Sequence, residues 1–259
     1  MTVELFKTLA FVAILLTGLA GGYLSLRLAA SSRKEAIFSL GNCLAGGIFL
    51  GAGLIHMLPD AQEGFSAVAA GIDFPVVSVI CACGFLLVLL IERVATSGHG
   101  HAGEEQAPSS KPVYPYVLAL VLSIHSIITG IALGAEGTVA MAFVIVVAVL
   151  AHKGSAAFAL SISLQRAGTA RAAVWRTVIL FSFMTPIGIL AGAGLTRLLT
   201  GTAEEVFEAI FDALAAGTFL YVASMEIIEH EFAQRQRRVA KFACVTLGLA
   251  LMAALAIWT

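Results

Sequence analysis

The stretches VLALVLSIHSIITGIALGAEG at residues 117–137 and MAFVIVVAVLAHKGSAAFALSISL at residues 141–164 decide the fold class of this chain. Each is a mainly apolar run of about 20 residues or more, the length that a helix needs to cross the hydrocarbon core of a bilayer. Six further runs of this kind flank them, so we predict an all-α polytopic membrane protein with eight transmembrane helices in a single domain over residues 1–259. The predicted spans are Glu4–Leu28, Ala36–Pro59, Phe74–Ala95, Val113–Gly134, Thr138–Leu164, Ala172–Leu199, Glu205–Ile228 and Ala240–Trp258.

The overall composition supports the membrane assignment. Hydrophobic residues make up 59% of the 259 residues and charged residues only 12%. Soluble domains are roughly half apolar and about a quarter charged, so this chain has too few charges to cover a water-facing surface. The composition excludes a soluble enzyme and a disordered chain. The net charge of -1 also excludes a nucleic-acid partner that would need a basic excess.

The distribution of basic residues predicts the orientation in the membrane. Twelve of the fifteen lysine and arginine residues fall on odd-numbered connections, and connections rich in Lys and Arg face the cytoplasm. Both termini are therefore expected outside, on the side that carries more acidic residues. The absence of a long targeting segment favours a bacterial cytoplasmic membrane. The twelve residues are Arg27, Arg33, Lys34, Arg93, Lys111, Arg166, Arg171, Arg176, Arg235, Arg237, Arg238 and Lys241.

The connection TSGHGHAGEEQAPSSKP at residues 96–112 has the composition of a flexible cytoplasmic linker. Its two histidines, His99 and His101, could capture a divalent cation transiently, as short His-containing tracts can. The alternative is an inert linker.

Polar side chains in the middle of two spans are the first sign of function. A strongly polar group in the hydrocarbon core costs several kcal/mol unless it lines water or binds a ligand. His125 lies near the middle of its run, with Ser126 beside it and Thr129 one turn further on the same face. His152 and Lys153 lie at the middle of the following run, so the two imidazoles can face each other at one depth. This pattern predicts a shared transition-metal ion, because neutral imidazole is a common ligand for such ions. The alternative is a pair of packing histidines.

Further polar residues predict an entrance on the outer side. His56 and Asp60 are four residues apart and share a helix face near the outer surface. They could strip water from an entering ion or simply hold the helix end. Glu136 follows His125 by eleven residues, about three turns, and is predicted on the same stripe about 16 Å further out. That distance suits an entrance step and is too far for a shared ion.

A similar group predicts an exit on the inner side. In the sequence MEIIEHEF, Glu226 and His230 are four residues apart near the inner end of the seventh span. They could receive an ion before its release. The alternative is that Glu229, His230 and Glu231 are simply solvated at the membrane boundary.

Five motifs in this order resemble those of the Zrt/Irt-like (ZIP) family of divalent-metal transporters. Each motif is modest alone, but together they extend over most of the chain and lie on the predicted spans. The chain is most similar to the subgroup with His-Lys in the fifth span, which includes animal plasma-membrane zinc importers. The motifs are HMLPD at 56–60, HSIITG at 125–130, HKGSAAFALSISL at 152–164, FSFMTPIGIL at 181–190 and AAGTFLYVASMEI at 215–227.

The resemblance implies eight helices in a 3+2+3 arrangement, with the first and last three related as inverted repeats. It implies import of a divalent metal, most often Zn²⁺, by an elevator-like or rocking movement of two bundles, and often a homodimer. Zn²⁺ would be the transported substrate and not a catalytic cofactor. The implied positions are His125, Ser126 and His152 in the central metal site, His56 and Asp60 at the entrance, and Met225 and Glu226 at the exit.

The chain departs from the family pattern at the central site. The family usually has Glu one turn after the histidine of the fourth span, where this chain has Thr129. Relatives with two metals carry a second Glu where this chain has Ala156, and an acidic or amide residue where it has Lys153. An ammonium at Lys153 would repel a second dication, so we expect one central metal. Without the Glu, we expect that metal to be bound weakly.

These departures leave alternatives to a working transporter. The missing Glu fits a transport-impaired relative that binds or senses metal without flux. A more remote alternative is an intramembrane metal-dependent hydrolase using His and Asp. The chain contains neither HExxH nor GxSxG, and His56 lies at a different depth from His125 and His152. We therefore expect no enzymatic activity.

Overall fold

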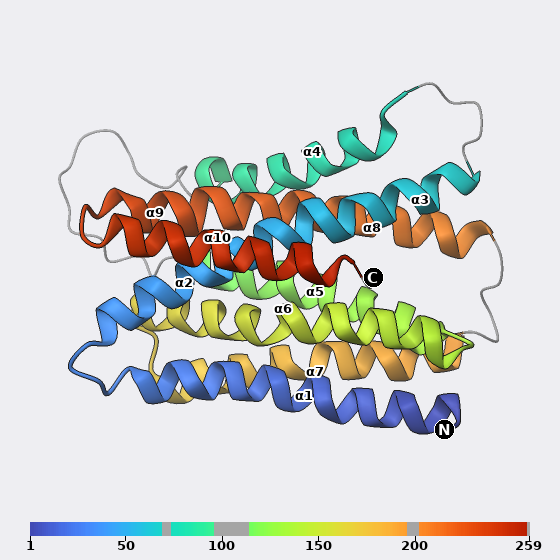
Figure 1. Ribbon diagram of the computed structural model, residues 1–259, viewed down its shortest axis with the longest axis horizontal. Coiled ribbons are helices and arrows are strands. Elements are labelled where there is room, and N and C mark those ends of the chain that lie inside the picture. Colours follow the sequence, from blue (N-terminus) through green and yellow to red (C-terminus); the bar gives the residue numbers. More distant parts are fainter. Residues whose placement is uncertain (69–73, 96–113, 196–201, 258–259) are drawn as a thin grey trace.

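The computed structural model describes residues 1–68, 74–95, 114–195 and 202–257, and in these residues the only regular secondary structure is helical (Figure 1). The predicted linker at residues 96–112, with His99 and His101, lies outside the described residues. The helices, of which the three marked η are π-helical, are α1 (Val3–Leu28), α2 (Lys34–Gly51), η1 (Ala52–Met57), α3 (Leu58–Val68), α4 (Val76–Leu89), η2 (Leu90–Ala95), α5 (Tyr114–Ala135), α6 (Val139–Arg166), α7 (Arg171–Leu195), α8 (Thr202–Tyr221), η4 (Val222–Ile228), α9 (Glu229–Ala233) and α10 (Arg238–Leu255).

Eight of the described helical segments are long and apolar enough to span a membrane, which confirms the predicted fold class. The second continues to Ser66 instead of ending at Pro59, because η1 and α3 extend α2 without a break. Pro59 lies inside this continuous helix, directly after the π-helical turns of η1, and the wide turn accommodates the missing N–H of proline. The seventh span likewise continues through η4 and α9 to Ala233.

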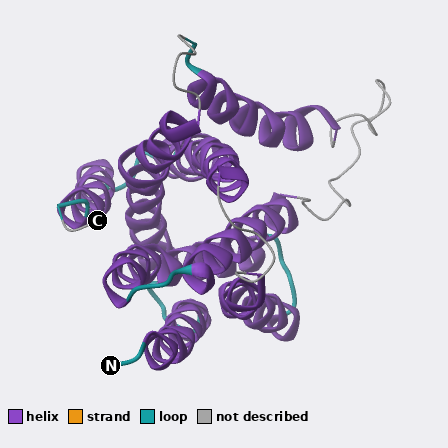
Figure 2. Cartoon of the chain, turned by 90° about the vertical axis from the view of Figure 1, so that its right-hand side faces the viewer, coloured by secondary structure: helices purple, strands orange, loops and turns teal. Residues whose placement is uncertain are grey.

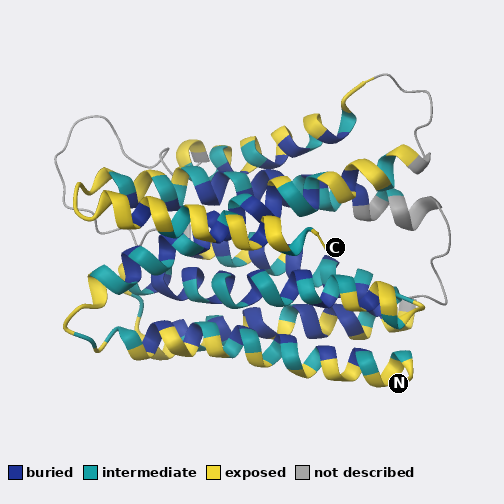
Figure 3. Ribbon diagram, in the orientation of Figure 1, coloured by how far each residue is buried: buried dark blue, intermediate teal, exposed yellow. Residues whose placement is uncertain are grey.

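Large apolar side chains cover the outside of the molecule. Leu16, Leu86, Leu120 and Leu190 are each more than half exposed, and exposed residues recur along the helices (Figure 3). Soluble monomers rarely expose an apolar surface of this extent. It is the surface expected of an integral membrane protein.

The helices pack as two bundles. One contains α1, α5, α6 and α7, in the lower part of Figure 1, and the other contains α2, α3, α4, α8 and α10. Figure 2 views most of them nearly end-on and shows that they are roughly parallel. Glycine allows close approach within the first bundle, since a Cβ on Gly188 of α7 would lie 2.2 Å from the carbonyl oxygen of Ile127 on α5. The main contact between the bundles is that of α2 with α6.

The two ends of the molecule differ in charge. The turns between α1 and α2, between α6 and α7, and between α9 and α10 lie at one end, on the left in Figure 1. These turns and the helix ends that flank them carry most of the described basic residues. We call this the basic end. The N-terminus, α3 and the turn between α5 and α6 lie at the opposite end, with Asp60, Glu63 and Glu136. We call this the acidic end.

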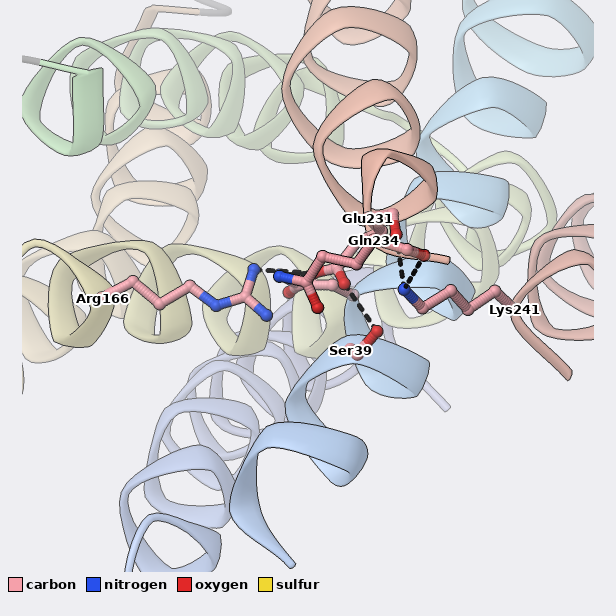
Figure 4. A network of polar contacts seen from close by, with 6 residues as sticks. Ser39, Arg166, Glu231, Gln234 and Lys241 are labelled. Carbon is pink, nitrogen blue, oxygen red and sulfur yellow. Dashed lines mark hydrogen bonds and ion pairs between the residues drawn. The ribbon is translucent and has the colours of Figure 1, made fainter. Parts of the chain in front are cut away.

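A buried ionic network joins the two bundles at the basic end (Figure 4). Glu231 of α9 is fully buried, so the alternative that it is solvated is wrong, whereas Glu229 and His230 are exposed. The Glu231 carboxylate accepts hydrogen bonds from Ser39 Oγ at 2.6 Å, Asn42 Nδ2 at 3.1 Å and Arg166 Nη1 at 2.6 Å. These partners compensate the desolvation of the buried charge. Arg166 ends α6 of the first bundle, and the other members belong to the second.

The same network closes the turn into α10. Lys241 is buried, and its Nζ donates hydrogen bonds to the backbone carbonyl oxygens of Glu231 and Gln234 (Figure 4). The carbonyl groups at the end of α9 have no partners within that helix. Lys241 therefore caps the end of the seventh span.

Replacing Glu231 by alanine is expected to destabilise the fold. The substitution leaves the Arg166 guanidinium and two buried polar groups without their acceptor, which typically costs about 3 kcal/mol and lowers the melting temperature of a chain of this size by roughly 6–12 °C. Thermal unfolding of the purified protein in detergent measures the shift. Glu229→Ala, an exposed carboxylate on the same helix, is the matched control and should change it little. Equal shifts in the two variants would contradict a structural role for the network.

Candidate metal site

The two central histidines face each other across the first bundle. His125 comes from the middle of α5 and His152 from the middle of α6, and both are buried. Their ring centroids are 5.7 Å apart. A tetrahedral zinc ion with Zn–N bonds of about 2.0–2.1 Å places the centroids of two ligating rings about 5–6 Å apart. The predicted pair is therefore brought together at a separation that suits one shared ion.

Both imidazoles keep a ring nitrogen available. The Nδ1 atoms of His125 and His152 are buried and have no hydrogen-bond partner among the described residues. Buried polar atoms in native proteins are nearly always paired, and the exceptions call for a functional explanation. Ligation of a metal by neutral imidazole is one such explanation.

Thr129 occupies the position next to His125 where the family usually carries Glu. Its Oγ1 lies 3.3 Å from His125 Nε2 and donates a hydrogen bond to the His125 backbone carbonyl at 3.0 Å. The hydroxyl is thus held within reach of the imidazole. It can offer an ion a lone pair or a bridging water, but no negative charge.

A cavity of about 210 Å³ connects the histidine pair to the acidic end. That volume holds about seven water molecules at roughly 30 Å³ each, so a hydrated ion fits. Glu136 is not among the residues that line it. The polar lining residues are His56, Asp60, His125, Thr129, His152 and Asp212.

The mouth of this cavity contains the predicted entrance pair and one residue that the sequence analysis missed. His56 Nδ1 lies 3.0 Å from Asp60 Oδ2, four residues further along the chain. Asp212 of α8 lines the same cavity. His56 lies in π-helical η1, and such wide turns are frequent at functional sites. Two carboxylates and one imidazole therefore surround the mouth of the cavity.

Lys153 lies next to His152 but points into the bundle. Its Nζ donates three hydrogen bonds of 3.0–3.1 Å, to Ser126 Oγ, to Thr185 Oγ1 and to the Phe181 carbonyl oxygen. Three donors are what an ammonium group has, so the group is fully satisfied. It also lies 3.9 Å from the centroid of the Phe181 ring, an arrangement that stabilises a cation.

The lysine also determines the position of Ser126. Ser126 is buried, its Oγ accepts from Lys153, and it does not line the cavity that contains the histidines. The structure brings together His125, His152 and Thr129 but places Ser126 with Lys153. Ala156, also buried, contributes no ligand atom.

No ready cluster of charged ligands surrounds the histidine pair. In the part of the chain that the structure describes, no group of three or more His, Cys, Asp or Glu side chains is placed to hold a metal ion. An ion between His125 and His152 would therefore complete its coordination with water or hydroxyl oxygen.

A second cavity of about 210 Å³ opens near the basic end. Glu226 and His230, both predicted at the exit, line it together with Asn42 and Arg166. Glu226 Oε1 lies 4.0 Å from Arg93 Nη2. The predicted exit residue Met225 is 39% exposed and is not among the lining residues.

Eight apolar helices around a buried imidazole pair, with a cavity toward each end, define an integral membrane protein whose site suits a divalent transition metal. Comparison with known proteins extends this class to a family. The family described as ZIP Zinc transporter matches residues 4–114 and 95–256. The chain belongs to the ZIP family, which consists of transporters and not enzymes, so the hydrolase alternative is set aside.

Individual relatives cover nearly the whole chain. The mouse zinc transporter ZIP2 is 32% identical over 89% of this chain and 88% of its own length. The zebrafish zinc transporter ZIP1 is 31% identical over 96% of both chains. A probable zinc transporter 12 of Arabidopsis thaliana is 24% identical over 98% of this chain and 86% of its own length.

Proposed function

We propose that this chain imports a divalent transition metal, Zn²⁺ before others, into the cytoplasm through a single site between α5 and α6. The observation that carries the proposal is the histidine pair at the closed end of a cavity that starts at Asp60 and Asp212. The relatives named as zinc transporters support zinc as the substrate.

The direction follows from the charge at the two ends. We place the basic end in the cytoplasm, because positively charged connections are retained there, and we place both termini outside. The acidic end then collects cations from the outer solution by raising their local concentration. An ion would pass from His56 and Asp60 to the histidine pair, and later to Glu226 and His230.

The division into two bundles suggests how the bound ion is carried across the membrane. We propose that α1, α5, α6 and α7 carry the histidine pair past the helices of the second bundle, in an elevator-like or rocking motion. Support comes from the division of the helix contacts into two groups. The pathway residues of the second bundle lie in π-helical segments, with His56 in η1 and Glu226 in η4.

We propose that the central site holds one ion, and holds it weakly. Two neutral imidazoles leave the +2 charge of a metal uncompensated in a site of low dielectric constant. The ammonium of Lys153 lies directly behind the pair and disfavours a second dication. Weak binding permits fast release and relaxed selectivity among divalent ions.

Zinc uptake into liposomes that contain the purified protein tests this function. We expect saturable uptake of Zn²⁺, reported by a zinc-sensitive dye inside the vesicles, and competition by other divalent ions. The missing carboxylate at Thr129 favours a second candidate, a transport-impaired protein that binds metal without flux. Zinc binding to the purified protein without uptake would support that candidate and overturn transport.

A further inference from the structure

Two helices of the second bundle repeat one pattern at seven-residue intervals. The span of α2 and η1 carries Asn42, Phe49 and His56, and the span of α8 and η4 carries Asp212, Phe219 and Glu226. Seven residues are nearly two α-helical turns, so Asn42 and Phe49 share one face of α2, and Asp212 and Phe219 share one face of α8. The wider turns of η1 and η4 follow each phenylalanine and carry the last residue of each series. Both series read as a polar residue, a phenylalanine and a polar residue.

The two series divide the pathway into three levels. His56 and Asp212 line the cavity at the acidic end, whereas Asn42 and Glu226 line the cavity at the basic end. The phenylalanines lie between, and both are fully buried. Their ring centroids are 5.1 Å apart, so they contact each other between the two cavities.

Phe219 also contacts both histidines. Its ring centroid lies 4.9 Å from that of His125 and 6.1 Å from that of His152, in edge-to-face geometry with each. A side chain of the second bundle thus packs against the two candidate ligands of the first.

Two further side chains complete an apolar layer at this depth. Leu122 lies one turn from His125, and Ala156 lies one turn from His152, each on the side of the basic end. Both are buried, and neither they nor the phenylalanines line either cavity. The layer therefore offers no ligand atom to an ion immediately beyond the histidines. An apolar constriction of this kind blocks ions because they cannot shed their water there.

We propose that Phe49 and Phe219 form the gate that separates the outer cavity from the inner cavity in this conformation. Phe219 is its central member, because it contacts Phe49, His125 and His152. The inference rests on the proposed function insofar as an ion is carried from one cavity to the other. It adds the element that keeps the two cavities from joining into an open pore.

Proton leak in liposomes tests the gate. Vesicles that contain wild-type protein or Phe219→Leu, Phe219→Val or Phe219→Ala are loaded with a pH-sensitive dye, and a potassium gradient with valinomycin sets the driving voltage. We expect the leak to increase as the side chain becomes smaller, by about tenfold or more for alanine, because a water-filled path replaces the constriction. Phe49→Ala should act in the same direction.

A matched control distinguishes a gate from a general packing residue. Phe181 is also fully buried, but it packs against Lys153 within the first bundle, so Phe181→Leu should leave the leak at the wild-type level. The Phe219 series repeated with His125→Ala and His152→Ala should leak as before, since the leak needs no metal site. Failure of zinc uptake by the wild type would count against the proposed function alone.

The series has an outcome that overturns the gate. Variants at Phe219 that are monodisperse and leak no faster than the wild type, whatever the size of the side chain, would contradict it. If alanine at Phe219 prevents folding, the leucine and valine variants and Phe49→Ala decide the question. A leak from Phe181→Leu equal to that from Phe219→Leu would overturn the assignment to the Phe49 and Phe219 pair.

Discussion

Replacing His125 and His152 together by alanine is expected to reduce zinc uptake to the rate of protein-free liposomes. The pair provides the only two imidazoles that face each other at the closed end of the outer cavity in the described structure. Without them, an ion at this depth has the Thr129 hydroxyl and water as ligands, and transfer into the bundle becomes prohibitively costly. Initial rates of dye-reported Zn²⁺ uptake measure the effect.

The control removes the same number of imidazoles elsewhere. His99→Ala with His101→Ala changes the predicted linker, and this variant should retain most of the uptake. If the linker captures metal, its loss should matter only at the lowest zinc concentrations. Uptake that survives the loss of His125 and His152 would show that metal crosses by another route.

Introducing glutamate at Thr129 is expected to tighten zinc binding by about tenfold or more, which corresponds to at least roughly 1.4 kcal/mol. Thr129 lines the same cavity as both histidines, so a carboxylate on a longer side chain at this residue can reach an ion held between the imidazoles. It would also supply the negative charge that two neutral ligands lack. Competition with a zinc-chelating dye in detergent measures the affinity.

Glutamine at the same residue separates charge from length. Thr129→Gln extends the side chain by the same number of atoms but adds no charge, so its affinity should remain near that of the wild type. If release limits transport, Thr129→Glu should also lower the maximal uptake rate as it tightens binding. Equal affinities of Thr129→Glu and the wild type would refute the explanation based on a missing charge.

The fold was largely predictable from the sequence. Long apolar runs specify membrane-spanning helices almost without reference to tertiary contacts, because no other regular structure satisfies the backbone there except a closed barrel. The depth of His125 and His152 also followed from helix geometry, since each lies near the middle of its run. The ends of two spans were less predictable, because α3 and α9 carry the second and seventh spans beyond the predicted ends at Pro59 and Ile228.

The rotation of each helix was not predictable, and it decides which of the predicted residues line the cavity. Ser126 and His125 are neighbours in the sequence, yet only His125 lines the cavity, because Lys153 holds Ser126 on a different side. Glu136 was predicted on the same stripe as His125, but it lies just beyond the end of α5 at Ala135, and the cavity does not reach it. Packing partners from distant segments decide both cases.

Two residues show what distant contacts and repeated spacing contribute. The burial of Glu231 depends on Ser39, Asn42 and Arg166, which no local pattern connects to it. Asp212, in contrast, could have been found from the sequence, because it lies fourteen residues before Glu226. The signal was present in the spacing and required only comparison of the second and seventh spans.

The position of zinc in the protein tests the central claim most directly. An anomalous difference map, recorded at the zinc absorption edge from crystals grown with zinc, locates the ion without assumptions about transport. We predict one peak within bonding distance of both His125 and His152, with no carboxylate in its coordination shell. A map without a peak between these imidazoles, or one with a second peak beside Lys153, would contradict the account.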